Sequence, residues 1–415
     1  MTGTVTNPLN QPLDLPSGVT IKNRFLKAAM NEALGDRNGA PTQNHVRLYE
    51  RWARGGAGVL LTGNVMVDPE HLGEPGNVAV QDESHMDTLR QWASTTDGTG
   101  TQLWMQINHP GKQSPRTINR HPVAPSPLPI DGQFSNYFAP PRELEVNDIH
   151  DLVTRFATTA RIAKAAGFAG VEIHAAHGYL ISQFLSPLHN QRTDEYGGSL
   201  ENRMRFLTEV YEAVRAEVGD DFPVAVKLNS SDGVEGGFSQ ADSLEVAEKL
   251  SSLGVDLLEI SGGTYDKPLM QGNASGADSS QAPFFLDYAN ELRKRVHTPV
   301  ALTGGFRSVE TMEQAINEDF ASMVGIGRPF VLAPDLPTRI IESGRQGTIE
   351  LPYITTHIPA LDRALGPILA NNWYEEQMYR LSQGKHATAG SGISALAFTI
   401  RHHGLAALAP RRASR

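Results

Sequence analysis

Two histidines and a tyrosine stand close together in the segment HAAHGY, which begins at His174 and runs through His177 to Tyr179. Two neutral imidazoles at this spacing could ligate a metal, but a catalytic metal site needs a third protein ligand, and no HExxH run accompanies them. As hydrogen-bond donors, the two rings could instead hold and polarise a carbonyl oxygen. A phenolic hydroxyl is protonated at neutral pH, so Tyr179 could then donate a proton. The alternative is a structural pair of histidines with a packing tyrosine.

A lysine interrupts the apolar run from Pro223 to Ser231. In a strand, Lys227 points away from the side on which Val226 and Leu228 lie, so it faces the interior if those two residues face covering helices. A buried ammonium there needs an anion or a strongly polar partner. Three interpretations follow: an anionic ligand, a structural ion pair, or a lysine that forms a Schiff base.

Glycines follow two late apolar runs. Gly304 and Gly305 end the segment LTGG, and Gly327 precedes Arg328 in the segment GIGRP. Glycine lets a phosphate approach backbone N–H groups closely, and an arginine adds a charge-assisted hydrogen bond. The pattern favours a phosphate site over two unrelated tight turns.

Short apolar runs, each followed by a segment of helical periodicity, recur along the chain and must position these side chains. The eight runs are 24–30, 58–67, 101–108, 170–176, 223–231, 257–263, 299–305 and 321–328. Strands that are apolar on both faces and alternate with helices belong in a parallel sheet, either doubly wound or closed. Eight repeats favour an α/β fold of the (β/α)8 TIM-barrel type, whose active site forms at the carboxyl ends of the strands.

Other segments complete this prediction. The stretch 13–23 predicts an N-terminal hairpin at the bottom of the barrel, and the Pro-rich stretch 109–147 predicts a lid or capping loop after the third strand. The periodicity over 147–166 predicts a helix that Asn147 can cap. We expect a barrel over residues 1–345 and a C-terminal helical extension and tail over 346–415. In the tail, Trp373, Tyr374 and Tyr379 could pack across a subunit interface of a homo-oligomer.

The composition excludes several classes of function. With a net charge of -10 and no basic block, neither nucleic acid nor an anionic membrane surface is expected as a partner. The chain has no cysteine, which excludes disulfides, iron–sulfur clusters, thiolate zinc sites and a cysteine nucleophile. There is no signal-like start and no uninterrupted apolar stretch of membrane-spanning length, so we expect a soluble, cytoplasmic protein.

The segment from His174 to Arg203, HAAHGYLISQFLSPLHNQRTDEYGGSLENR, closely resembles the signature segment of the Old Yellow Enzyme family. The motifs NRFLKAAM, QINHPGKQ, VKLNSSD, ALTGGFRS and VGIGRPF extend the resemblance from about Asn23 through Pro337. Membership implies a (β/α)8 barrel that holds FMN non-covalently at the strand ends. It also implies reduction by NADH or NADPH and reoxidation by an alkene that a carbonyl or similar group activates.

The resemblance further implies roles for single residues. His174 and His177 would hold the activating oxygen of the substrate, hydride would come from flavin N5, and Tyr179 would protonate the α-carbon. Lys227 would lie near flavin N1 and O2, and Gln106 at the pyrimidine edge. The other cofactor-binding positions would be Ala28, Ala29, Met30, Asn31 and Asn64 near the flavin ring, and Gly304, Gly305, Gly327 and Arg328 at the phosphate. No metal is expected.

Three positions depart from the pattern of many relatives. Asn31 stands where others have threonine or cysteine, which leaves the flavin potential open. Lys227 replaces an arginine, so the charge is kept but the bidentate geometry is lost. The pairing of His174 with His177, where other members have His-Asn, resembles the bacterial branch.

We therefore expect an ene-reductase that uses FMN and NAD(P)H on small α,β-unsaturated carbonyl or nitro compounds. Longer relatives that reduce dienoyl-CoA carry an iron–sulfur cluster and a second flavin domain. Without cysteine this chain cannot hold that cluster, so hydride must come directly from a nicotinamide. The alternatives are dehydrogenation or nitro-group reduction at the same site, a flavin-binding protein without activity, and a flavin-free barrel. That barrel would be a metal hydrolase using His174 and His177 or a lyase using a Schiff base at Lys227.

Overall fold

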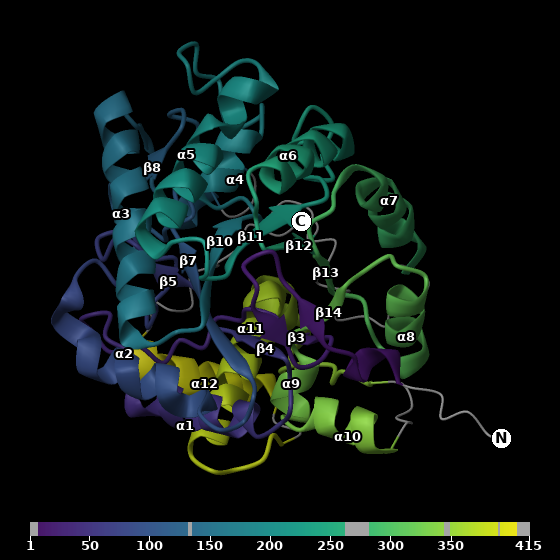
Figure 1. Ribbon diagram of the computed structural model, residues 1–415. Helices are drawn as coiled ribbons and strands as arrows, with labels where there is room; N and C mark the ends of the chain where they lie inside the picture. Colours follow the sequence, from purple (N-terminus) through teal and green to yellow (C-terminus); the bar gives the residue numbers. More distant parts are fainter. Residues whose placement is uncertain (1–6, 132–134, 262–281, 344–348, 389–390, 405–415) are drawn as a thin grey trace.

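The computed structural model describes residues 7–131, 135–261, 282–343, 349–388 and 391–404. At its centre, parallel strands form a closed barrel, in which β14 pairs with β3 and β7 pairs with β10 (Figure 1). The barrel strands are β3 (Phe25–Lys27), β4 (Val59–Leu61), β7 (Gln102–Asn108), β10 (Gly170–Ala175), β11 (Val224–Asn229), β12 (Leu257–Ser261), β13 (Val300–Thr303) and β14 (Met323–Ile326). Each lies within one of the predicted runs, so the predicted (β/α)8 TIM barrel is confirmed.

Helices cover the outside of the barrel (Figure 1). They are α1 (Gln43–Ala53), α2 (Met86–Ala93), α3 (Val146–Ala166), α4 (Leu180–Leu185), α5 (Leu200–Val218), α6 (Gln240–Ser252), α7 (Ala282–Arg295), α8 (Val309–Asn317), α9 (Pro329–Leu332) and α10 (Leu336–Ser343). Two short strands, β5 (Val65–Met66) and β6 (Val78–Ala79), extend the sheet beside β7. The outward-facing strand residues, such as Val171, Val226 and Val324, join the apolar core beneath these helices.

Helix α3 begins one residue earlier than predicted. Its N-cap is Glu145, and the prediction that Asn147 caps this helix is wrong. The physical reason is Asp148, whose Oδ2 accepts a hydrogen bond from the backbone N–H of Glu145 at 3.0 Å and so stabilises a start at that residue. Asn147 lies inside the first turn instead.

The barrel interior is apolar near the amino ends of the strands. Leu26, Val59, Trp104, Ala225 and Met323 face inward there and pack together. The predicted hairpin is present as β1 (Leu13–Asp14) and β2 (Thr20–Ile21), and apolar residues of this hairpin pack onto the same cluster. This apolar plug leaves the carboxyl end, where the inward-facing residues are polar, for a ligand.

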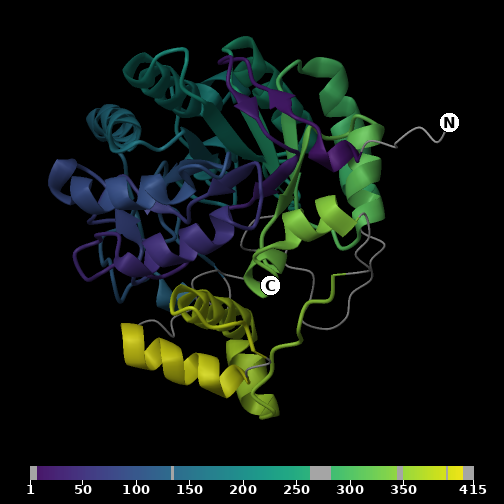
Figure 2. The ribbon, with the colours of Figure 1, turned by 60° about the horizontal axis from the view of Figure 1, so that its bottom comes forward.

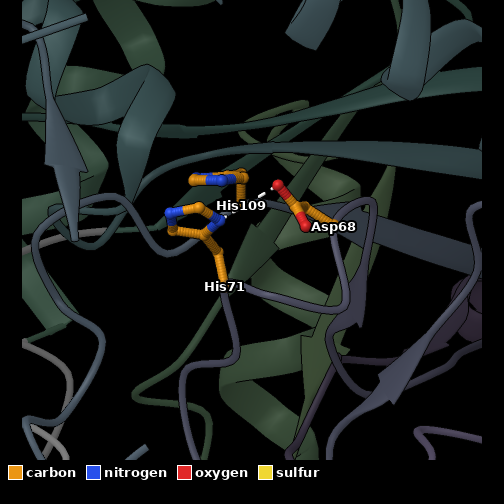
Figure 3. Close-up of side chains that lie close together, drawn as sticks. All are labelled: Asp68, His71 and His109. Atoms are coloured by element: carbon orange, nitrogen blue, oxygen red, sulfur yellow. Dashed lines mark hydrogen bonds and ion pairs between the residues drawn. The ribbon is translucent and has the colours of Figure 1, made fainter. Parts of the chain in front are cut away.

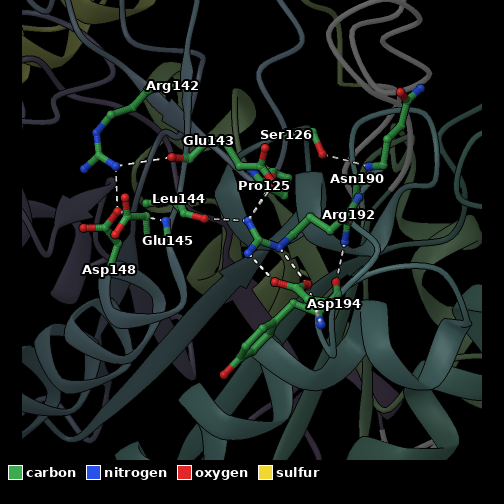
Figure 4. Close-up of polar contacts among 12 residues, drawn as sticks. Pro125, Ser126, Arg142, Glu143, Leu144, Glu145, Asp148, Asn190, Arg192 and Asp194 are labelled. Atoms are coloured by element: carbon green, nitrogen blue, oxygen red, sulfur yellow. Dashed lines mark hydrogen bonds and ion pairs between the residues drawn. The ribbon is translucent and has the colours of Figure 1, made fainter.

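The segment between β7 and α3, predicted as a lid, contains a pair of short parallel strands, β8 (Val123–Ala124) and β9 (Arg142–Glu143). Arg192, which follows α4, ties this segment to the barrel (Figure 4). Its guanidinium donates to the carbonyls of Pro125 at 3.0 Å and Leu144 at 2.5 Å. It also binds both carboxylate oxygens of Asp194, at 3.0 and 2.5 Å. The side chain is only 5% exposed, so one buried arginine holds both strands of the lid.

Replacing Arg192 with alanine is expected to lower the free energy of unfolding by about 2–3 kcal/mol, because the carbonyls that it serves lose their donor. Replacement with lysine should recover only part of this loss, since an ammonium cannot reproduce the planar fork of donors. Urea denaturation measures the change. Arg90 is a matched control, because its ion pair with Asp87 is exposed and its loss should cost less than about 0.5 kcal/mol. Equal stability of the R192A and R90A variants would contradict the anchoring role.

Beyond the barrel, α11 (Pro359–Ser382) and α12 (Gly392–His403) pack against each other and α11 packs against α1 (Figure 2). The rings of Trp373 and Tyr374 are 1% and 7% exposed within this single chain. The expectation that they pack across a subunit interface does not hold for these two rings, because this chain already buries them. Among the described residues, no helix is both long and apolar enough to cross a membrane.

Candidate active site at the carboxyl ends of the strands

The residues of the HAAHGY motif come together where β10 ends. The ring of His174, on β10, has its centroid 5.1 Å from the ring of His177 and 4.9 Å from the ring of Tyr179, and both pairs meet edge to face. Tyr179 is the N-cap residue of α4. His177 has a φ of +61°, a left-handed conformation that is uncommon for a residue with a side chain and is typical of functional sites. This turn brings two imidazoles and a phenol to one place.

Hydrogen bonds orient the two imidazoles. Nδ1 of His174 accepts a hydrogen bond from the backbone N–H of Ala176 at 3.2 Å, so the proton of the neutral ring is on Nε2. Nε2 of His177 lies 2.6 Å from Oγ of Ser261, at the end of β12. The backbone N–H of His177 donates to Oδ1 of Asn229, at the end of β11. His174 therefore presents an N–H donor, and the ends of two neighbouring strands hold His177.

Tyr179 is oriented by a residue far away in the sequence. Nδ2 of Asn64, which follows β4, donates to the Tyr179 hydroxyl at 3.2 Å. Phe138 and Ile130 of the lid pack on the tyrosine ring, which is 7% exposed. Gln113, also of the lid, donates to the carbonyl of Gly178. The structure thus encloses the phenol between the barrel and the lid.

Lys227 faces the barrel interior, as the alternation along its strand predicts. Its Nζ lies 2.7 Å from Oε1 of Glu259 on β12, and the two side chains are 3% and 0% exposed. The structural ion pair that the sequence left open is therefore present. A Schiff base requires the neutral amine as nucleophile, whereas this lysine forms an ion pair with a buried carboxylate. Sequence reasoning missed Glu259, although its place between Leu258 and Ile260 gave the same inward signal as that of Lys227; the register that sets the two opposite each other comes from the structure.

The residues predicted near the flavin ring lie at the carboxyl ends of β3 and β14. The backbone N–H of Ala28 continues β3 by donating to Ile326 at 2.9 Å, and the chain then passes through Ala29. A Cβ added to Gly327 would touch the Met30 side chain at 3.5 Å, so these two residues are neighbours. Oδ1 of Asn31 accepts a hydrogen bond from Asn77 at 3.0 Å. The structure thereby brings the ends of β3 and β14 together.

The glycines predicted at the phosphate lie at the ends of β13 and β14. Gly304 and Gly305 have φ values of +104° and +80°, and space is open beside Gly305. Arg328 is the N-cap residue of α9. Burial and the charge of Arg328 lower the pKa of the nearby Arg307 guanidinium, which shows that two cations converge here. Such a pair is suited to a dianion.

Two residues at this point escaped sequence reasoning. Arg307 lies two positions after Gly305 in the quoted motif ALTGGFRS, so the signal was available. Tyr374 belongs to α11 of the C-terminal extension, and no pattern indicated where it would lie. Burial raises the pKa of the Tyr374 hydroxyl, while the charges of Arg328 and Arg307 oppose this rise, so the phenol lies within electrostatic reach of both guanidinium groups.

This donor set fits FMN. Oε1 of Gln106 and both amide atoms of Asn108 are buried without a hydrogen-bond partner in the structure, and such atoms cost about 1–3 kcal/mol each unless a ligand binds them. The pyrimidine edge of a flavin offers one N–H donor between two carbonyl acceptors, which complements an amide oxygen and an ammonium. At the other end, two arginines and exposed glycine backbone complement a phosphate. The residues that would hold the group are therefore Gln106 and Lys227 for the ring and Arg307 and Arg328 for the phosphate.

A separate cluster consists of Asp68, His71 and His109, whose possible ligand atoms all lie within 4.8 Å of one another (Figure 3). Nδ1 of His71 lies 3.0 Å from the Asp68 carboxylate. Nδ1 of His109 accepts a hydrogen bond from the backbone N–H of Gly111 at 3.1 Å, so the proton of the neutral ring is on Nε2 and blocks that atom as a metal ligand. Arg155 also approaches Asp68, at 3.9 Å. We therefore assign no metal to this cluster.

Comparison with known proteins agrees with this geometry. The model of the NADH:flavin oxidoreductase / NADH oxidase family matches residues 8–347. The chain is 39% identical over 356 residues to the NADH-dependent flavin oxidoreductase iliE of Hypocrea jecorina (strain QM6a), covering 80% of this chain and 88% of that protein. It is 37% identical over 407 residues to the NADH-dependent flavin oxidoreductase iccE of Talaromyces variabilis, covering 90% and 98%. The old yellow enzyme homologue from Zymomonas mobilis has a TM-score of 0.70 and 28% identity, covering 82% of this chain and 94% of that chain.

The family match spans every strand of the barrel, and therefore the polar residues at the carboxyl ends of those strands. The relatives at 39% and 37% identity cover most of their own length, so the likeness is not confined to one motif. Taken with a barrel interior whose unpartnered donors and acceptors suit a flavin, these matches place the chain in the NADH:flavin oxidoreductase / NADH oxidase family of Old Yellow Enzyme barrels, as an FMN-dependent oxidoreductase that uses NADH or NADPH.

Proposed function

We propose that this oxidoreductase is an ene-reductase, in which the bound flavin passes hydride from the nicotinamide to an alkene conjugated with a carbonyl or nitro group. The observation that carries the proposal is the hydrogen bond from Asn64 to the Tyr179 hydroxyl beside the paired rings of His174 and His177. Reduction of a polarised alkene needs donors for the oxygen on which negative charge develops, and an acid for one carbon. These residues supply both.

Each residue has a distinct part in this proposal. Nε2–H of His174 donates a hydrogen bond to the activating oxygen of the substrate. His177 binds the same oxygen, and the contact of its Nε2 with Oγ of Ser261 fixes the orientation of the His177 ring. Tyr179 protonates the α-carbon, and Asn64 orients its hydroxyl. The lid excludes water from the phenol, which favours proton transfer to the substrate carbon over exchange with solvent.

The residues that would hold the cofactor form two groups, one for its ring and one for its phosphate. Gln106 and Lys227 bind the pyrimidine edge of the ring, and the ammonium stabilises negative charge there. Arg307 and Arg328 bind the phosphate together with the backbone at Gly305. The loss of any of these contacts weakens cofactor binding, while the loss of Lys227 also changes the electrostatics of the ring.

Replacing Lys227 with methionine should lower the two-electron midpoint potential of the bound flavin, because the cation that stabilises the reduced, anionic ring is removed. We expect at least a tenfold fall in the ratio of reduced to oxidised flavin at a fixed applied potential, which corresponds to about 30 mV. Spectroelectrochemical titration measures this ratio. Lys249 to methionine is the matched control, because Lys249 is exposed on α6. An unchanged midpoint potential in the Lys227 variant would mean that Lys227 does not lie at the flavin site.

The decisive experiment is the visible spectrum of the purified protein, followed by anaerobic addition of NADH, or of NADPH in a parallel sample, and then of cyclohexenone. The proposal expects a yellow protein that bleaches with the nicotinamide and regains its colour with the enone. Parallel reduced samples receive a nitroalkene or a nitroaromatic compound in place of the enone, and a sample of the oxidised enzyme without nicotinamide receives a saturated ketone.

Each result has a definite meaning. Reoxidation by the nitroaromatic compound but not by the enone would favour nitro-group reduction, and reduction of the oxidised flavin by the saturated ketone would favour dehydrogenation. A flavin that bleaches but is reoxidised by none of the added compounds would overturn ene-reduction.

A further inference from the structure

Two buried glutamates lie inside the barrel, in register with the two residues proposed to bind the flavin ring. Glu172 on β10 and Glu259 on β12 are both 0% exposed. Glu172 is in register with Gln106 on β7, and Glu259 is in register with Lys227 on β11. Each of the two residues proposed to bind the flavin ring therefore contacts a buried carboxyl group on a neighbouring strand.

The bonds within this layer are short and specific. Nε2 of Gln106 donates to Oε2 of Glu172 at 2.5 Å, and Nζ of Lys227 lies 2.7 Å from Oε1 of Glu259. Because its amide nitrogen donates to Glu172, the amide oxygen of Gln106 remains an acceptor without a partner. Glu172 thereby decides which end of the Gln106 amide is offered to a ligand.

One oxygen of each carboxyl group is buried without a hydrogen-bond partner, although the Thr303 hydroxyl lies near Glu259. These are Oε1 of Glu172 and Oε2 of Glu259, and the two side chains are close enough to bond to each other. Two ionised carboxylates only accept hydrogen bonds and repel each other in a buried site. A single proton between them turns this repulsion into a hydrogen bond and provides a partner for both oxygens.

The surroundings decide which glutamate keeps the proton. Lys227 touches Glu259, the Thr303 hydroxyl also faces Glu259 from β13, and Lys27 adds positive charge from the outer side of β3. Burial and the charge of Glu259 raise the pKa of Glu172 well above its usual range. Burial opposes ionisation of Glu259 as well, but Lys227 holds the pKa of Glu259 below its usual value.

We propose that Glu172 and Glu259 hold one proton between them, on Glu172, and that Glu259 is a positioning residue that holds Lys227 and partly neutralises its charge toward the cofactor. Glu172 then acts as a neutral hydrogen-bonding acid that orients Gln106. The electrostatic part of this inference rests on the proposed place of the flavin ring above Lys227, whereas the shared proton does not.

The first test is the infrared spectrum of the FMN-loaded enzyme at neutral pH. A protonated carboxylic acid has a carbonyl band that an ionised carboxylate lacks, and labelling with 13C-glutamate separates this band from those of the flavin. We expect the E172Q variant to lose one such band and the matched variant E217Q, which alters an exposed glutamate of α5, to retain it. Identical spectra for wild type and E172Q would show that Glu172 is ionised and would overturn the shared proton.

The second test is the midpoint potential of the bound flavin in three variants. E172Q replaces a neutral acid with a neutral amide, so the ratio of reduced to oxidised flavin should stay within about threefold of wild type. The double variant E172Q/E259Q removes the negative charge whichever glutamate carries it, and this ratio should rise at least tenfold, or about 30 mV. The single variant E259D keeps the negative charge and should have the same midpoint potential as the wild type.

The variants separate the possible failures. An E259D shift as large as that of the double variant would mean that packing, not charge, sets the potential, and would overturn the role of Glu259. If neither the Lys227-to-methionine variant nor the double variant changes the potential while E172Q loses its infrared band, the flavin ring does not lie above Lys227. That result contradicts the proposed flavin placement and the role of Glu259 toward the cofactor, but leaves the shared proton intact. Should the double variant fail to bind FMN, the infrared comparison still decides the proton.

Discussion

Replacing Tyr179 with phenylalanine is expected to slow reoxidation of the reduced enzyme by cyclohexenone by about 10²- to 10⁴-fold, the usual contribution of a positioned general acid. Bleaching by NADH should stay within about threefold of wild type, because that half-reaction needs no proton from the phenol. The variant loses one hydroxyl and the hydrogen bond from Asn64 but keeps the ring that packs on His174 and Phe138. Anaerobic stopped-flow measurement of the two half-reactions separates these effects.

Tyr137 provides a matched control on the lid. Its ring is 41% exposed, and its replacement by phenylalanine should change neither half-reaction. An equal loss of both half-reactions in the Tyr179 variant would mean that the phenol supports the structure of the site and is not its acid. Replacement of Asn64 by alanine should reproduce part of the defect, since the phenol then loses its orienting donor.

Replacing both His174 and His177 with alanine is expected to weaken the binding of a phenolic ligand by about 10²- to 10⁴-fold. The phenol oxygen stands in for the substrate oxygen, and each hydrogen bond to a charged oxygen contributes about 1.5–3 kcal/mol. Because 1.4 kcal/mol is tenfold in affinity, two such bonds account for this range. Spectral titration of the oxidised enzyme with p-hydroxybenzaldehyde measures the dissociation constant.

The control for the histidine pair is His297, which is exposed between α7 and β13. Its replacement by alanine should leave phenol affinity unchanged. The double variant loses the side-chain contacts to Ser261 and to the Ala176 N–H but keeps the backbone hydrogen bond from residue 177 to Asn229, so we expect it to retain the barrel. Unchanged phenol affinity in a folded double variant would exclude the histidines as the oxygen-binding pair.

Strand-level features of this protein follow from local patterns. The eight apolar runs each contain a barrel strand, because residues that are apolar on both faces must be covered by helices on one side and by the barrel interior on the other. The inward direction of Lys227 follows from its two apolar neighbours in the strand, since side chains alternate with a period of two. The HAAHGY motif likewise determines that His174, His177 and Tyr179 lie within one turn, as only a few residues separate them.

Helix α3 and the tail show where local patterns stop. Asn147 is a residue type that often caps helices, but the hydrogen bond to Asp148 stabilises a helix start at Glu145. Which of several candidate residues becomes the N-cap depends on the path by which the chain enters the helix. The aromatic residues of the tail could have packed on a partner or on the barrel. Trp373 and Tyr374 are buried within this chain, where α11, which carries them, packs against α1 and α9 of the barrel and against α12 of the tail.

By itself, the sequence determined the barrel, its strands, the HAAHGY motif and the inward lysine, because each depends on residues that are neighbours along the chain. Only the tertiary structure decided the partners of those residues. Asn64 reaches Tyr179 across 115 positions, and Glu259 reaches Lys227 across 32. The physical reason is closure of the barrel, which brings strand ends into register that no local periodicity relates. The electrostatics of the site depend on these contacts, so they could be described only from the closed barrel and not from the sequence.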